Sequence, residues 1–258
     1  MRVLLVTKAS GNNYSIEAGL ADGKKHFDHH GEYSVQPSPC KDTRITVVGT
    51  NDVVEITHID ADTYVGLLRM AGKELPERVA ELKFMEQIDL EGNSCCMMKE
   101  NSTLLYMVGV GQLARYLKFP RVTEDTQDVT NFVYAMMART SREIVELGRE
   151  ATEKSESAYK NCKVVIKGKI GYWVIGSDDP LDASRPYEDG VEIVVVHRKH
   201  YKTISIYCSP KSKYSFGGKT IAGIKFAGHP KAAGSPRGQE FNQEDGKRVF
   251  EEVVSSLK

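Results

Sequence analysis

The stretch VVEITHIDAD, residues 53–62, decides the fold of the first part of this 258-residue chain. Its first five residues form a mostly apolar, β-branched run that is typical of a buried strand. His58, Asp60 and Asp62 follow at alternate positions, so in an extended chain they would share one side. One imidazole and two carboxylates at the carboxyl end of a strand indicate a site for Mn²⁺ or Mg²⁺. The alternative is a polar strand end in which Asp62 caps the next helix.

Short β-rich runs and helical stretches alternate around this segment. Residues 3–6 and 44–48 have the composition of further strands, and residues 64–71 and 75–84 have that of helices. This alternation predicts an α/β domain with a parallel sheet over residues 1–128.

The second half of the chain has a different pattern. Residues 129–160 look helical throughout and predict a linking helix. Strand-like runs and a final amphipathic helix follow, so residues 161–258 predict a smaller α+β domain. The runs are residues 164–166, 172–175, 192–197 and 203–207, and the final helix is residues 242–257.

Charge and cysteine content argue against several classes of protein. Lys plus Arg and Asp plus Glu both number 35, and a formal charge of zero argues against a protein that wraps long duplex DNA. The five cysteines include no C-x-x-C pair, which favours neither a disulfide framework nor a zinc site and indicates a reducing cytoplasm. The apolar run at residues 3–6 is too short for a signal peptide or a membrane span, so we expect no membrane association.

The run HFDHHG, residues 26–31, holds three of the seven histidines of the chain. Imidazole is a common metal ligand, and an adjacent carboxylate such as Asp28 can orient its second nitrogen. Metal binding is one interpretation of this run, and an exposed, pH-sensitive turn is the other. We take His26 to be a bystander.

The run GHPKAAG, residues 228–234, combines glycines with a histidine and a lysine. Glycines around a turn let backbone N–H groups approach an anion closely. His229 would then contact a phosphate oxygen, with Lys231 or Arg237 adding positive charge. The alternative is a structural loop rich in glycine and proline.

Together the three motifs resemble those of the DHH/DHHA1 phosphoesterases. Asp28-His29-His30 matches the motif that names the family, and residues 58–62 are similar to its H-x-D-x-D metal-binding signature. Residues 228–234 resemble the G-G-H-x-x-A-A-G signature of the DHHA1 domain, with Ala227 in place of the first glycine. In the family the H-x-D-x-D motif precedes DHH. The reversed order here implies either a permuted first domain or one false match.

The resemblance implies an N-terminal DHH-like domain, a linking helix and a smaller DHHA1-like domain, with the active site in the cleft between the domains. It also implies hydrolysis of phosphate esters that depends on two Mn²⁺ or Mg²⁺ ions. Asp89 would be shared by both ions, and Asp28 would orient His29. His30 and His229 would be catalytic, assisted by the amides near Gly228 and Gly234. The implied metal ligands are His29, His58, Asp60, Asp62 and Asp89, and the candidates for a fourth carboxylate are Asp42, Asp52, Asp125 and Asp128.

Neutral net charge favours a nucleotide or short oligonucleotide as substrate over long DNA. Tyr214 and Phe216 are candidates to stack a base, although sheet packing suits Phe216 better. Tyr207 replaces the arginine of the family's S-x-R-S element, which keeps open a non-catalytic nucleotide-binding protein of the same fold. A phosphatase or pyrophosphatase that acts on compounds without a base is the other alternative. The sequence does not give the oligomeric state, and a homodimer is one option.

Overall fold

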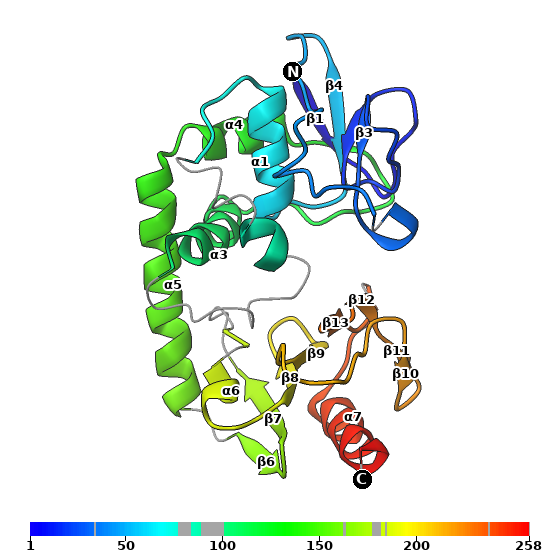
Figure 1. The fold of residues 1–258 in the computed structure, drawn as a ribbon, viewed down its shortest axis with the longest axis vertical. Helices are drawn as coiled ribbons and strands as arrows, with labels where there is room; N and C mark the ends of the chain where they lie inside the picture. Colours follow the sequence, from blue (N-terminus) through cyan, green and yellow to red (C-terminus); the bar gives the residue numbers. More distant parts are fainter. Residues whose placement is uncertain are drawn as a thin grey trace. The chain divides into compact units, whose positions relative to one another are not determined.

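The computed structural model describes residues 1–33, 35–76, 84–88, 101–161, 164–176, 182–183, 185–236 and 238–257. The chain forms two compact units. Unit 1 comprises Met1–Glu86 and Ser102–Arg149, and unit 2 comprises Gln87–Asn101 and Glu150–Lys258. Each unit has its own β-sheet and its own helices (Figure 1).

A five-stranded sheet forms the centre of unit 1. Its order is β3-β2-β4-β1-β5; the first four strands run parallel, and β5 is antiparallel to β1. The predicted α/β fold with a parallel sheet is confirmed. The strands are β1 (Arg2–Leu5), β2 (Tyr14–Ile16), β3 (His26–Phe27), β4 (Val53–Ile56) and β5 (Gln127–Asp128).

Buried apolar side chains keep β1 and β4 in the middle of this sheet. Val3 and Leu5 of β1 and Val54 and Ile56 of β4 are fully buried. They share one cluster with apolar residues of α1 and α4, so these helices pack on the sheet. The helices of unit 1 are η1 (Gly31–Tyr33), α1 (Ala61–Met70), α3 (Ser102–Tyr116), α4 (Thr130–Met137) and the start of α5 (Ser141–Asn161).

The strands of unit 1 differ from the prediction in two ways. β2 and β3, with three and two residues, are too short to show a periodic pattern in the sequence. Residues 44–48, predicted as a strand, are irregular. Asp42 Oδ1 accepts a hydrogen bond from the Arg44 N–H at 2.9 Å and holds a turn there, while the Val48 N–H donates to the carbonyl of Met70 at the end of α1. The predicted helix over residues 75–84 lies mostly outside the described residues.

The predicted continuous helix over residues 129–160 is two helices, because α4 ends at Met137 and α5 begins at Ser141. Thr140 and Glu143 explain the break. The Thr140 hydroxyl accepts a hydrogen bond from the Glu143 N–H at 3.2 Å, and the Glu143 carboxylate accepts one from the Thr140 N–H at 2.8 Å. This reciprocal capping box starts a new helix and leaves Thr140 outside it.

Two glycines bring α3 and α5 into close contact within unit 1. Gly109 of α3 lies against the carbonyl of Ile144, and Gly148 of α5 lies against the carbonyl of Leu105. A Cβ at either glycine would overlap the facing carbonyl oxygen. This contact explains a glycine in the middle of α5, where it costs about 1 kcal/mol relative to alanine.

We expect Gly109→Ala to lower the free energy of unfolding by about 1 to 3 kcal/mol, because the new methyl group overlaps a backbone oxygen. Gly111 in the same helix is the matched control, since a Cβ there meets nothing within 4 Å. Gly111→Ala should leave stability unchanged or raise it by up to about 1 kcal/mol. Urea denaturation of both variants measures the difference, and equal stabilities would contradict the close helix contact.

Unit 2 contains a six-stranded sheet in the order β12-β13-β9-β8-β7-β6. β7 and β8 run parallel, and the other neighbouring pairs are antiparallel. Side chains alternate along β7: Tyr172 stacks on Phe250 of α7, and Trp173 packs on Tyr159 at the other face. The predicted α+β fold is confirmed. The elements are β6 (Val165–Lys167), β7 (Ile170–Ile175), α6 (Arg185–Glu188), β8 (Ile193–Arg198), β9 (Thr203–Cys208), β10 (Thr220–Ile221), β11 (Ile224–Lys225), β12 (Ala227–His229), β13 (Ala232–Gly234) and α7 (Gln243–Ser256).

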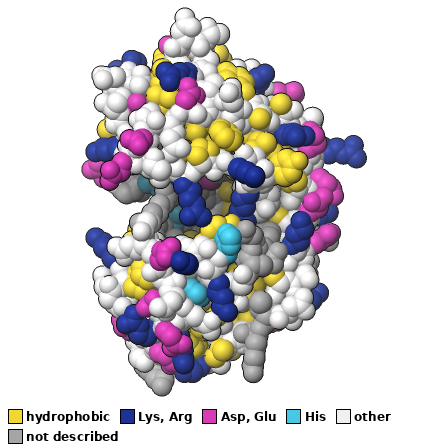
Figure 2. All heavy atoms as spheres, turned by 180° about the vertical axis from the view of Figure 1, so that it is seen from behind, with side chains coloured by type: hydrophobic (Ala, Val, Ile, Leu, Met, Phe, Trp, Pro, Cys, Tyr) yellow, Lys and Arg dark blue, Asp and Glu magenta, His cyan; other side chains and the backbone are white. Residues whose placement is uncertain are grey.

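The surface is mixed in charge. Positive and negative side chains are interspersed over the face shown in Figure 2, in keeping with the formal charge of zero. Within the described ranges, no helix has the length and apolar character needed to cross a membrane. Two of the five cysteines, Cys40 and Cys208, are described, and both are buried.

Candidate metal centre

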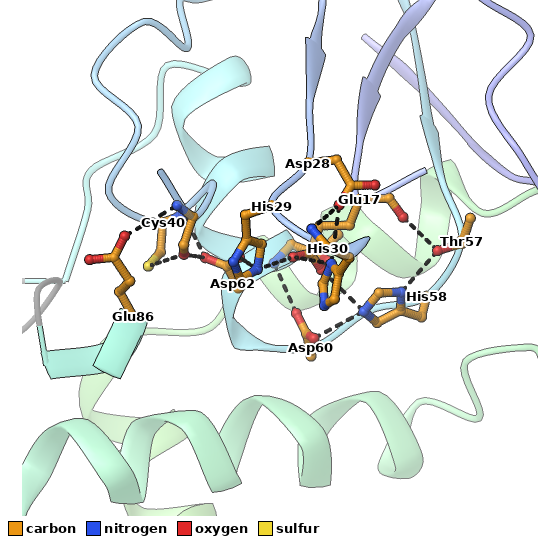
Figure 3. A network of polar contacts seen from close by, with 12 residues as sticks. Glu17, Asp28, His29, His30, Cys40, Thr57, His58, Asp60, Asp62 and Glu86 are labelled. Atoms are coloured by element: carbon orange, nitrogen blue, oxygen red, sulfur yellow. Dashed lines mark hydrogen bonds and ion pairs between the residues drawn. The ribbon is translucent and has the colours of Figure 1, made fainter. Parts of the chain in front are cut away.

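The polar side chains of the centre come from the carboxyl ends of three neighbouring strands. Glu17 follows β2, Asp28, His29 and His30 follow β3, and residues 58–62 follow β4 and lead into α1. Because β3, β2 and β4 run parallel, their ends meet at one edge of the sheet, and Figure 3 shows the side chains converging there. The two motifs that stand in reversed order along the chain therefore lie side by side.

Glu17 lies at the centre of this cluster, and the sequence analysis missed it. It is 3 % exposed, and its carboxylate lies 3.0 Å from His29 Nε2 and 3.1 Å from His58 Nε2. The Thr63 hydroxyl donates a hydrogen bond to Oε2 at 2.8 Å. The φ of Glu17 is 50°, a strained value for a residue with a Cβ. Its sequence signal is an acidic residue directly after a short β-rich run.

Asp62 is held so that one of its oxygens faces the histidines. Oδ1 accepts hydrogen bonds from the Ser38 hydroxyl at 2.5 Å and from the Cys40 N–H at 2.6 Å. Oδ2 lies 3.4 Å from His29 Nε2 but has no hydrogen-bond partner within the described part of the chain. A buried carboxylate oxygen without a donor suits a metal ligand, because a cation would compensate its lost hydration.

Asp60 caps α1 and also contacts His58. Its Oδ1 accepts a hydrogen bond from the Thr63 N–H at 2.9 Å, and its Oδ2 lies 3.0 Å from His58 Nε2. The helix cap is therefore Asp60, and the alternative in which Asp62 caps the helix is wrong. The Thr57 hydroxyl lies 3.0 Å from His58 Nδ1, so both ring nitrogens of this histidine have partners.

Asp28 holds both the backbone and the ring of His30. Its Oδ1 accepts a hydrogen bond from the His30 N–H at 2.8 Å and lies 3.1 Å from His30 Nδ1. The Gly19 N–H donates to Oδ2 at 2.7 Å. The carboxylate thus joins the ends of β2 and β3 and fixes one imidazole.

The interpretation of residues 26–31 as an exposed turn is wrong. Asp28 and His29 are 4 % and 2 % exposed. His26 is also buried, and its Nδ1 lies 2.9 Å from the Ser15 hydroxyl, so it joins the neighbouring strands β2 and β3. His30 is the accessible member of the run, with 41 % of its side chain exposed.

Among the described residues, two groups of side chains have ligand atoms close enough to hold a metal ion, and both contain Glu17. One group is Glu17, His29 and His30, and the other is Glu17, His58 and Asp60; in each, the ligand atoms lie within 4.8 Å of one another. Imidazole and carboxylate donors suit Mn²⁺ and related divalent ions. These donor sets, together with the unpartnered oxygen of Asp62, fit divalent cations.

The protonation of the centre reflects its excess of buried carboxylates. Burial, and after it the negative charge of Glu17, raises the pKa of Asp62 to about 7. Burial and the charge of Asp60 act to raise the pKa of Glu17, but hydrogen bonds with His29 and His58 outweigh them and lower it. Burial acts to lower the pKa of His58, yet Asp60 and Glu17 raise it well above its ordinary value. A cation would replace these protons.

Asp89 lies outside the described residues. The four candidates for a further carboxylate are described, and none of them belongs to either group. Asp42 and Asp128 pair with arginines, Asp52 precedes β4 and so lies at the opposite end of that strand, and Asp125 is exposed. Among the described carboxylates, Glu17 is the one that belongs to both groups.

In unit 2, the run at residues 228–234 forms the hairpin of β12 and β13, in which His229 pairs with Ala232. Gly228 has a φ of 119°, and a Cβ there would lie 2.7 Å from the Ala232 carbonyl oxygen, so only glycine fits. Gly234 is the last residue of β13. The hairpin is thus a tight backbone structure that presents His229 beside its turn.

Lys231 has a different role from the predicted one. Its ammonium group donates hydrogen bonds to the carbonyls of Ser212 and Tyr214, the second at 2.9 Å. It therefore fixes a backbone loop instead of offering a free charge to phosphate. Phe216 is buried in the core of unit 2, which confirms its packing role, and Arg237 lies outside the described residues.

No protein-family model matches this chain, and no curated protein matches it. Similar solved structures include a pGpG-specific phosphodiesterase of Vibrio cholerae, 12 % identical over 81 % of both chains with a TM-score of 0.44. RecJ of Thermus thermophilus in complex with Mg²⁺ is 13 % identical over 76 % of this chain and 38 % of its own, with a TM-score of 0.35. An exopolyphosphatase-related protein of Bacteroides fragilis is 11 % identical over 95 % of this chain and 83 % of its own, with a TM-score of 0.34.

This chain resembles the DHH/DHHA1 phosphoesterases in its motifs, and the first two stand in reversed order along the sequence. At the TM-scores above, the solved structures do not decide what the chain does. We therefore base the function on the geometry of the DHH-like centre. In it, Asp28-His29-His30 and residues 58–62 converge on Glu17.

Without metal, Asp62→Asn should be more stable than the original chain above neutral pH. Because the pKa of Asp62 is raised by folding, the folded chain keeps a proton that the unfolded chain releases, and stability falls as pH rises from about 4 to about 7. Asparagine keeps the Oδ1 acceptor and removes the charge. We expect the free energy of unfolding of Asp62→Asn to exceed that of the original chain by at least about 1 kcal/mol at pH about 8. This difference should vanish at pH about 3.5.

Urea denaturation in the presence of a chelator measures this gain. Asp52→Asn, outside the cluster, is the control and should show no comparable pH dependence. A gain for Asp62→Asn that persists at low pH would contradict a proton held at this position.

Proposed function

We propose that this protein is a divalent-metal-dependent phosphoesterase that hydrolyses phosphate esters of nucleotides or short oligonucleotides. The observation that carries the proposal is one buried carboxylate, Glu17, that belongs to two groups of ligand side chains. Sites that cleave phosphate esters often hold two ions about 3.5–4 Å apart. A shared carboxylate is a direct way to hold two cations that close.

The described residues supply enough ligands for two ions. Glu17, His58 and Asp60 would hold one, and Glu17, His29 and Asp62 would hold the other, with His30 beside them. Mn²⁺ or Mg²⁺ is the expected cation, because the donors are imidazole nitrogens and carboxylate oxygens. When bound, such ions polarise the phosphate and lower the pKa of a coordinated water.

The chain itself orients these ligands. Ser38 and Cys40 fix Oδ1 of Asp62 and turn Oδ2 toward His29, and Thr63 fixes Oε2 of Glu17. Side chains held in this way need little rearrangement when a cation or substrate arrives.

His30 is the residue of the cluster best suited to meet the phosphate. It is more exposed than His29 or His58. The hydrogen bond from His30 Nδ1 to the Asp28 carboxylate raises the pKa of His30, and this favours a proton on Nδ1 and a positive charge on the ring. A charged imidazole would stabilise the negative charge that develops on phosphate in the transition state.

In unit 2, we propose that His229 and the backbone amides near Gly228 and Gly234 contact a phosphate of the substrate. The positive φ of Gly228 and the tight hairpin support this role, because they let the backbone approach an anion. The formal charge of zero supports a small substrate. The buried thiols of Cys40 and Cys208 are compatible with the reducing cytoplasm.

Glu17→Gln should weaken Mn²⁺ binding at least about ten-fold and lower the hydrolysis of a dinucleotide by at least about a hundred-fold, because both ligand groups lose a charge. Isothermal titration with Mn²⁺ and a dinucleotide assay measure the two effects. Glu55→Gln is the matched control: Glu55 is equally buried, in β4, but accepts hydrogen bonds from Ser10 and Asn13 outside both groups. Full activity in Glu17→Gln would reject the shared carboxylate.

A substrate comparison tests the class of reaction. With Mn²⁺, we expect faster turnover of a dinucleotide than of a nucleoside 3′,5′-bisphosphate or pyrophosphate, because a chain with a formal charge of zero has little general attraction for a more highly charged anion. Preferred turnover of pyrophosphate would favour the alternative of a phosphatase without base recognition. Tight Mn²⁺ binding with no turnover of any of the three would favour a non-catalytic protein.

A further inference from the structure

A cavity of about 610 Å³ lies in unit 2, a size in the range of small-molecule sites, which span roughly 300–1,000 Å³. Its floor is apolar. Ile170 of β7 and Ile193 of β8 are buried there, and Val254 and Leu257 at the end of α7 form one wall. The ring of Tyr214 completes the apolar lining. The floor offers a surface for a ring-sized apolar group.

Four lysines surround this floor, and two of them lack a carboxylate partner among the described residues. Lys167 pairs with Glu251 at 2.6 Å, and Lys169 pairs with Glu192. The other two, Lys211 and Lys213, are exposed and form no described ion pair; the Lys213 ammonium lies over the Tyr214 ring, 5.3 Å from its centre. Two uncompensated positive charges beside the cavity match a phosphate monoester, which carries about two negative charges near neutral pH.

The loop that carries these two lysines is held in place. Ser212, between them, is buried, and its N–H donates to the carbonyl of Ser209 at 3.0 Å. The Lys231 ammonium donates to the carbonyls of Ser212 and Tyr214. The loop is therefore ordered before any ligand binds, which lowers the entropy cost of binding.

This cavity is separate from the hairpin that carries His229. The hairpin strands β12 and β13 form one edge of the sheet, whereas Ile170 and Ile193 lie on β7 and β8 toward the other edge, with β9 in between. His229, Gly228 and Gly234 do not line the cavity.

We propose that this cavity binds a phosphate monoester with a ring-sized apolar group, of which a nucleoside monophosphate is the simplest example. Lys211 and Lys213 contact the phosphate, and the base lies over Tyr214 and the apolar floor. Stacking of a base on an aromatic side chain contributes about 1 to 3 kcal/mol. The binding needs neither a metal ion nor the centre in unit 1.

Titration of the full-length chain with AMP tests the site, both in chelator and with Mn²⁺. We expect shifts of the methyl NMR signals of Ile170, Ile193 and Leu257 in both conditions. The double variant Lys211→Ala/Lys213→Ala should weaken the AMP affinity read from these signals at least about ten-fold, because both unpaired charges are lost. Lys199→Ala/Lys225→Ala removes the same charge from elsewhere in unit 2 and should leave the affinity unchanged.

Two further measurements separate this site from the metal centre and from a simple anion site. Asp62→Asn should bind AMP at these methyl groups as the original chain does, whatever its effect on hydrolysis. Inorganic phosphate and adenosine should each bind more weakly than AMP. The proposal is overturned if AMP leaves the three methyl signals unchanged, if both double variants bind AMP equally, or if inorganic phosphate binds as tightly as AMP.

Discussion

The buried carboxylates of Glu17 and Asp62 impose the main constraint on unit 1. Two negative groups at one buried position repel each other and lose their hydration, so the fold must supply donors or cations around them. The donors come from three separate places: the histidines after β3 and β4, the hydroxyl of Thr63 on α1, and the loop of Ser38 and Cys40. Asp62 Oδ2 is buried and has no donor among the residues that the structure describes.

Strand direction, and not the order of motifs along the chain, creates this cluster. β3, β2 and β4 are neighbours and run parallel, so whatever follows each strand arrives at the same edge. The DHH motif can therefore precede residues 58–62 in the sequence and still meet them in space. The positive φ of Glu17 is a strained backbone conformation, so the fold carries an unfavourable local energy at this end of the strands.

The sequence predicts the long and periodic elements of the fold. It also predicts candidate ligand residues where several of them occur together in a short motif. β4, α1, the parallel sheet and the two histidine–aspartate runs follow from apolar patterning and residue spacing. Glu17 could not be found in this way, because it is a single acidic residue after a strand of three residues. Its partners become visible only when the sheet brings distant segments together.

Local hydrogen bonding explains the other differences between prediction and structure. The apolar pattern across Ala138 suggests one helix, but the Thr140–Glu143 capping box divides it. The turn held by Asp42 removes residues 44–48 from the sheet despite their β-branched composition. Lys231, a natural choice for a phosphate ligand, is engaged by backbone carbonyls that its position in the sequence does not reveal.

The first strand of the chain has a consequence for biosynthesis. β1 lies between β4 and β5 and pairs with residues 53–56 and 127–128. A ribosome therefore releases β1 long before its second neighbour, β5, exists, and Val129 and Val133 of the apolar cluster around Val3 and Leu5 follow equally late. During that interval the nascent polypeptide exposes an open strand edge, the kind of surface that chaperones shield from aggregation.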